Sequence, residues 1–239
     1  MANPSFSARC KQLILVTIFA CLHAITTHAQ PSVTSGLLPK LSLSYSLPKG
    51  YKLDNSIELR QKLYGKNPFA QGNFAYAYVL TDFNTSLSKS IGNKRSIGVG
   101  YTLRISDVGI YHRALQQFTW TKIYKNSSLV NRFASDQTFG PKNSVQLRLR
   151  YRALFKIPLS DKNANSNGFY LKLGNEYLGI INSDKDSDIE IRLIPLLGYK
   201  INQKAAIEFG LDGRINKIFE KNSSLSIWVN LGFYASFGS

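Results

Sequence analysis

The segment from 145 to 157, VQLRLRYRALFKI, places apolar side chains on every odd position. Basic residues take four of the even positions between them: Arg148, Arg150, Arg152 and Lys156. Residues two apart lie roughly 200° apart around a helix axis, so a helix would gather neither kind into a stripe. In a strand, the same spacing puts the apolar side chains on one face and the basic ones on the other. The segment therefore predicts a β-strand with one apolar and one charged face.

The same two-residue alternation recurs through the chain, and no segment keeps a helical period. It is clear at 37–47, 51–63, 95–106, 113–124, 169–181, 188–201, 205–215 and 225–237, and less regular at 74–91 and 129–139. Turn-forming sequences such as PKG, GNK, KNSS and NQK separate these runs. The pattern is typical of one all-β domain built from consecutive hairpins.

Strand length distinguishes two all-β architectures. Strands of soluble sandwiches have about 5–6 residues, whereas several of these runs are long enough for a tilted strand to cross the ~30 Å hydrocarbon layer. A soluble barrel with an apolar interior would show the same period, but the length favours a single antiparallel up-and-down transmembrane β-barrel. Eleven runs can be counted, including 145–157. Because bacterial single-chain barrels normally have an even number of strands, we expect ten or twelve.

Residues 1–30 have the features of a cleaved signal peptide. Arg9 and Lys11 precede an apolar run at 13–25, and Thr27 and Ala29 are small residues suited to cleavage after Ala29 or Gln30. The apolar run is shorter than the ~20 residues that a membrane-spanning helix needs. We therefore predict export, with residues 31–239 as the barrel domain, in the outer membrane of a Gram-negative bacterium.

Cleavage would also change the composition of the mature chain. Both cysteines, Cys10 and Cys21, would be lost, which excludes disulfides and thiol chemistry. Without Arg9 and Lys11, 28 basic and 14 acidic residues remain, a formal charge of +14. Such an excess indicates anionic partners. Since an exported chain does not normally meet nucleic acid, the partners we expect are outer-membrane lipid and an anionic solute.

Several segments after Arg113 resemble a known family. They are HRALQQFTWTKIYKNSSLVNRF, QLRLRYRALFKIPL, FYLKLGNEYLGI and LLGYKINQKAAIEFGL. In these segments, and above all in RLRYR and GYKIN, the chain is similar to the domain of unknown function 2490. This resemblance implies an exported outer-membrane-type β-barrel and carries no catalytic residues.

Enzymatic and metal chemistry find little support in the sequence. His112 is the one histidine of the mature chain, and it is expected in a connection between two strands, close in sequence to Ser106 and Asp107. Three such groups packed into one loop make a poor catalytic triad. The acidic segment 184–188 lacks the glycine and glutamate of a calcium loop. We therefore predict no catalytic residues, no metal, no cofactor and no enzymatic activity.

The basic face is the remaining candidate site. If the apolar face contacts lipid, the basic residues face the lumen: Arg148, Arg150, Arg152, Lys156, Lys172, Arg192 and Arg214. Acidic residues in the same phase are their expected partners: Glu176, Glu190, Glu208 and Asp212. Pairing would fill and rigidify a small barrel, whereas unpaired cations would attract anions. We expect a structural barrel or a small anion-preferring, porin-like pore. The alternatives are a module that contacts lipopolysaccharide phosphates or an acidic partner and, less expected, a barrel lipid enzyme.

Overall fold

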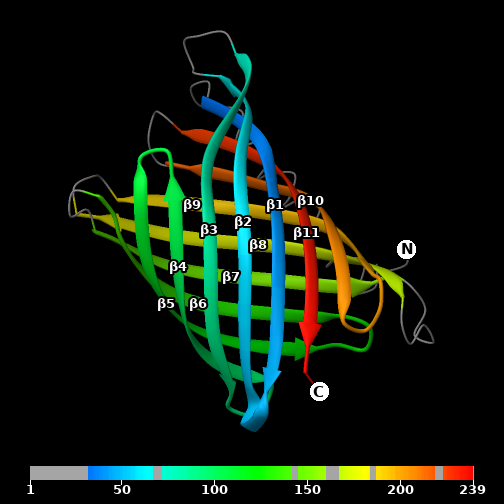
Figure 1. The fold of residues 1–239 in the computed structure, drawn as a ribbon. Helices are drawn as coiled ribbons and strands as arrows, with labels where there is room; N and C mark the ends of the chain where they lie inside the picture. Colours follow the sequence, from blue (N-terminus) through cyan, green and yellow to red (C-terminus); the bar gives the residue numbers. More distant parts are fainter. Residues whose placement is uncertain are drawn as a thin grey trace, which may run out of the picture.

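The computed structural model describes residues 32–66, 72–141, 145–159, 167–183, 187–218 and 223–238. These residues form eleven strands in one closed barrel (Figure 1). The strands are β1 (Ser32–Leu47), β2 (Tyr51–Lys66), β3 (Asn73–Ser90), β4 (Arg95–Ser106), β5 (Gly109–Ile123), β6 (Ser128–Phe139), β7 (Val145–Pro158), β8 (Gly168–Asn182), β9 (Asp188–Lys200), β10 (Ala205–Asn216) and β11 (Ser224–Phe237). A short 3-10 helix, η1 (Pro48–Gly50), joins β1 to β2. The predicted signal peptide lies outside the described residues.

The strands follow the alternation in the sequence. Each of the eleven runs falls on one strand, and the strands have between 12 and 18 residues. Tight connections need left-handed backbone: Gly50 at the β1–β2 turn has a φ of 75°, and Gly92 at the β3–β4 turn has a φ of 85°. Glycine adopts such angles without steric cost. Local sequence therefore determines both where the strands run and where the chain turns.

Closure of the barrel corrects the predicted strand number. Every neighbouring pair is antiparallel except β1 and β11, which run parallel from Ser32↔Ser224 to Tyr45↔Phe237. A parallel ladder also satisfies the backbone groups of two edges, so an odd number of strands can close. The expectation of ten or twelve strands is therefore wrong, and the antiparallel arrangement is interrupted at this one seam.

The two faces of the wall have opposite chemistry. Large apolar side chains on the outside are well exposed, among them Leu149 at 55%, Phe209 at 57% and Leu193 at 58%. On the inside, Arg148 is 6% exposed although it neighbours Leu149 in sequence. Strand geometry produces this contrast because successive side chains point to opposite faces. The barrel thus has an apolar outer wall and a charged, buried interior.

His112 lies within a strand and not in a connection as expected. The chain turns at 107 and 108, and β5 already begins at Gly109.

Among the described residues, no helix combines the length and apolar character needed to cross a membrane.

Candidate functional site

Charged side chains fill the interior of the barrel, and we call them the lumen charges. The acidic members are Asp54, Glu58, Asp82, Asp136, Glu176, Glu190, Glu208 and Asp212. The basic members are Lys40, Lys52, Arg60, Arg104, Arg113, Arg132, Arg148, Arg150, Arg152, Lys156, Lys172, Arg192 and Arg214. They stand on the inward phase of ten strands, β1 to β10, as the hydrogen-bonded register of the sheet sets it. Because the basic set is the larger, the described interior carries an excess of positive charge.

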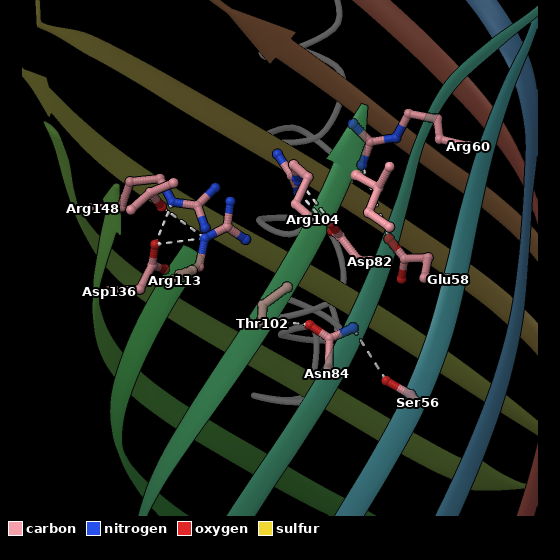
Figure 2. A network of polar contacts seen from close by, with 12 residues as sticks. Ser56, Glu58, Arg60, Asp82, Asn84, Thr102, Arg104, Arg113, Asp136 and Arg148 are labelled. Atoms are coloured by element: carbon pink, nitrogen blue, oxygen red, sulfur yellow. Dashed lines mark hydrogen bonds and ion pairs between the residues drawn. The ribbon is translucent and has the colours of Figure 1, made fainter. Parts of the chain in front are cut away.

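Asp136 is the most crowded of the acidic lumen charges. Its carboxylate is completely buried and accepts a hydrogen bond from Arg148 Nε at 2.6 Å. Arg150 Nη2 donates to its second oxygen at 3.3 Å, and Arg113 Nε lies 3.4 Å from the first. Figure 2 shows Arg113 and Arg148 converging on this carboxylate from neighbouring strands. Three guanidinium groups therefore share a single negative charge.

A second cluster centres on Glu176. Arg152 Nε lies 3.3 Å from one carboxylate oxygen, although it is not aligned for a hydrogen bond, and Arg192 Nη1 donates to the other at 3.4 Å. Arg192 also pairs with Glu190, which lies two residues away on β9. This cluster connects β7, β8 and β9 through directly opposed residues in the ladder.

Three further predicted residues, Lys156, Lys172 and Glu208, lie nearer to the end of the barrel at which β7 is followed by β8. Lys172 pairs with Glu208, whose Oε1 also accepts a hydrogen bond from Tyr170 at 2.7 Å. Lys156 lies over the ring of Tyr170, with its Nζ 4.1 Å from the ring centroid. The ammonium of Lys156 thus contacts an aromatic face, a favourable cation–π arrangement.

The last predicted pair is local. Arg214 and Asp212 lie two residues apart on β10 and form a bidentate ion pair, with nitrogen–oxygen distances of 2.9 and 2.7 Å. Both side chains are buried. Such a pair is rigid because the planar guanidinium matches both carboxylate oxygens.

Sequence reasoning missed a group of lumen charges on β1 to β6. Arg104 donates twice to Asp82, each time at 2.7 Å, from directly opposed positions on β3 and β4. Glu58 lies 3.5 Å from Lys40 and 4.0 Å from Arg60. The sequence did contain a sign of these residues, since each lies at one of the alternate positions of its strand that face the lumen. It was weakened by intervening serine, asparagine and threonine, which make the inward face look like ordinary polar surface.

Side chains fill most of the middle of the lumen. Glu208, Glu176 and Asp212 are 2%, 3% and 4% exposed, and the inward apolar residues Leu38 and Leu178 are 2% and 1% exposed. Groups in an open aqueous channel would be wetter than this. The interior is therefore largely filled, as is usual for barrels of few strands.

One mouth of the barrel keeps an open space, which we call the cup. It is a cavity of about 370 Å³ at the end where β4 turns into β5. Its lining includes Arg104 and Arg113 together with Ser106, Tyr111 and Thr138, and one carboxylate residue, Asp107. Arg113 Nε donates to Thr138 Oγ1 at 2.9 Å, which fixes this guanidinium at the base of the cup. The cup is therefore lined by two basic residues, one acidic residue and several hydroxyl groups.

The possible triad of Ser106, Asp107 and His112 is not assembled. His112 faces outward, where its Nδ1 lies 2.5 Å from the hydroxyl of Tyr101. Ser106 lines the cup on the other side of the wall, and its hydroxyl donates to the carbonyl of Gly109 at 3.0 Å. In the described part of the chain, no three His, Cys, Asp or Glu side chains are grouped as metal ligands would be. The acidic segment 184–188 lies mostly outside the described residues.

Comparison with known proteins gives one family and one fold. The family model described as "Protein of unknown function (DUF2490)" matches residues 36–224, which confirms the resemblance seen in the sequence. No curated protein matches. Among solved structures, the chain is similar to LpxR from Salmonella typhimurium, with a TM-score of 0.50 and 9% identity over 82% of this chain and 87% of that one.

The likeness to LpxR corrects one prediction. LpxR is an outer-membrane barrel enzyme, so the prediction that this chain is not an enzyme is overturned. At 9% identity the likeness concerns the fold alone and transfers no reaction to this chain.

Proposed function

The chain belongs to the DUF2490 family, proteins of unknown function, and we propose that it is an outer-membrane β-barrel whose positively charged interior attracts anions. The observation that carries this proposal is the excess of basic over acidic lumen charges in the described interior. Low-dielectric walls focus the field of such an excess along the lumen and toward its mouths. Anions of solutes or of lipid headgroups are the ligands that this field favours.

The outer wall supports placement in a membrane. Soluble proteins rarely expose contiguous apolar patches larger than a few hundred Å², whereas exposed apolar residues surround this barrel on nearly every strand. Closure through the β1–β11 seam leaves no strand edge that lipid could not satisfy. The shared fold with LpxR, an outer-membrane barrel, is consistent with the same location.

A first experiment tests the location. The mature chain should sediment with the outer-membrane fraction and resist carbonate extraction. It should also migrate faster in gels before boiling than after, because a lipid-facing barrel stays folded in detergent. Recovery of the folded chain as a soluble periplasmic protein would refute the membrane placement.

A second experiment tests the attraction of anions. In planar bilayers we expect a small conductance that prefers anions over cations, because side chains fill most of the lumen and the remaining field is positive. Exchange of Arg148, Arg150 and Arg152 together for glutamine should lower both the anion preference and its dependence on salt. Asp136 would keep Arg113, and Glu176 would keep Arg192, so neither carboxylate is left alone.

A matched control removes the same charge outside the lumen. Lys94, Lys122 and Lys125 are exposed at or near two turns, and their joint exchange for glutamine should leave ion preference nearly unchanged. A cation preference of the wild-type barrel would contradict the proposal. Silent bilayers after verified insertion would restrict the attraction to binding at the mouths.

A further inference from the structure

We propose that the cup is a binding site for a phosphate group, held by Arg113 and Arg104 of its lining and by Arg148, which lies behind Arg113 and shares Asp136 with it. This inference deepens the proposed function, since it assigns a place and a ligand class to the attraction of anions. It requires only that one mouth be accessible, and it does not require that ions pass through the lumen.

The charges in and beside the cup favour an anion. Arg104 is paired with Asp82, while Arg113, Arg148 and Arg150 share Asp136, so four guanidinium groups face two carboxylates. Asp107, in the turn between β4 and β5, also lines the cup and reduces the excess to one positive charge. Since one carboxylate serves three arginines, their remaining N–H groups are free for the oxygens of a phosphate, which accept charge-assisted hydrogen bonds.

A buried donor without a partner lies next to Arg113 of the cup, on the carboxylate that the two arginines share. Arg148 is 6% exposed, and its Nη2 has no hydrogen-bond partner, whereas its Nε is bound to Asp136. Leaving a buried charged donor unpaired is costly, and such donors normally have a ligand or a polar neighbour. In Figure 2 the guanidinium groups of Arg148 and Arg113 lie together beside Asp136, with their remaining nitrogens directed into the lumen.

The site is also pre-organised. Thr138 fixes Arg113 at 2.9 Å, and Asp82 fixes Arg104 through two bonds of 2.7 Å, so these side chains need little reordering on binding. Planar guanidinium forks match the oxygens of phosphate, and several of them can engage one group at once. Tyr111 and Ser106 line the same space and supply hydroxyl groups for further oxygens.

The chemistry fits two sources of phosphate, namely the free anion and a phosphorylated sugar headgroup of a lipid. The rim of the cup includes apolar side chains of Val79, Val108 and Val145, which could contact a group attached to the phosphate. Direct titration separates the sources. If glucosamine 1-phosphate binds more tightly than inorganic phosphate, the site recognises the sugar of the headgroup as well as its phosphate. Equal or weaker binding assigns it to the free anion.

The test uses the full mature chain in detergent micelles at low ionic strength, titrated with inorganic phosphate and with glucosamine 1-phosphate and followed by calorimetry. Arg113→Gln and Arg148→Gln should each weaken binding about tenfold or more, the loss expected for one charge-assisted hydrogen bond. The control is Arg132→Gln, which removes the same charge from the lumen but lies away from the cup. It should change affinity less than threefold.

Two results would overturn the inference. One is the absence of binding for both probes to the folded wild-type protein. The other is an equal loss of affinity in all three variants, which would indicate a diffuse field and no defined site. Phosphate binding by a barrel that is silent in bilayers would support the cup while refuting a pore. Conductance without phosphate binding would support a pore and refute the cup as a phosphate site.

Discussion

Replacement of Leu149 by arginine should lower the free energy of unfolding of the barrel by about 2–4 kcal/mol, the cost of a lipid-facing charge well inside the bilayer. Leu149 is 55% exposed on the outer wall of β7, where the surrounding side chains are apolar. Urea titration of the barrel in lipid vesicles, followed by tryptophan fluorescence, measures the change.

The matched control is the adjacent residue on the opposite face. Arg150→Gln removes one contact to Asp136, which keeps its bonds to Arg148 and Arg113, so the barrel should lose much less stability. Equal damage from both substitutions would contradict the assignment of the two faces. Greater damage from Arg150→Gln would indicate that the apolar wall does not face lipid.

Replacement of Asp136 by asparagine should destabilise the barrel by about 3–5 kcal/mol, as is typical when one partner of a buried ion pair is removed. The side chain of Asp136 is completely buried and is the common partner of Arg113, Arg148 and Arg150. Without its charge, three guanidinium groups would repel one another in a medium that screens them poorly. The same unfolding assay reports the loss.

Asp54 provides the comparison for this prediction. It pairs with Lys52 at 2.7 Å, but their side chains are 33% and 51% exposed, and pairs of that kind contribute at most about 1 kcal/mol. Asp54→Asn should therefore change stability little. If Asp136→Asn were as mild as Asp54→Asn, the cluster around Asp136 would not be a strongly coupled unit.

The amino-acid sequence alone is sufficient to locate the strands and to distinguish their two faces. Alternation such as that of Arg148, Leu149 and Arg150 is read from covalent geometry alone, since successive side chains of a strand must point to opposite faces. The turns are equally local, because glycine, asparagine and proline set the backbone angles that they need. For this reason all eleven alternating runs became strands, including the two irregular ones.

The number of strands and the identity of the ion pairs were decided by tertiary structure. Whether β1 pairs with β11, and in which direction, depends on how the whole sheet curves. The general preference of barrels for an even number of strands therefore could not predict the strand number of this one. Arg113 reaches Asp136 from the neighbouring strand, and no spacing along the chain reveals that three arginines share this carboxylate. The outward side of His112 followed from a two-residue turn at 107 and 108, which moved it from a connection into β5. Local alternation specifies what each strand shows on each face, but the register between strands specifies which of those side chains meet, and the cup exists only through that register.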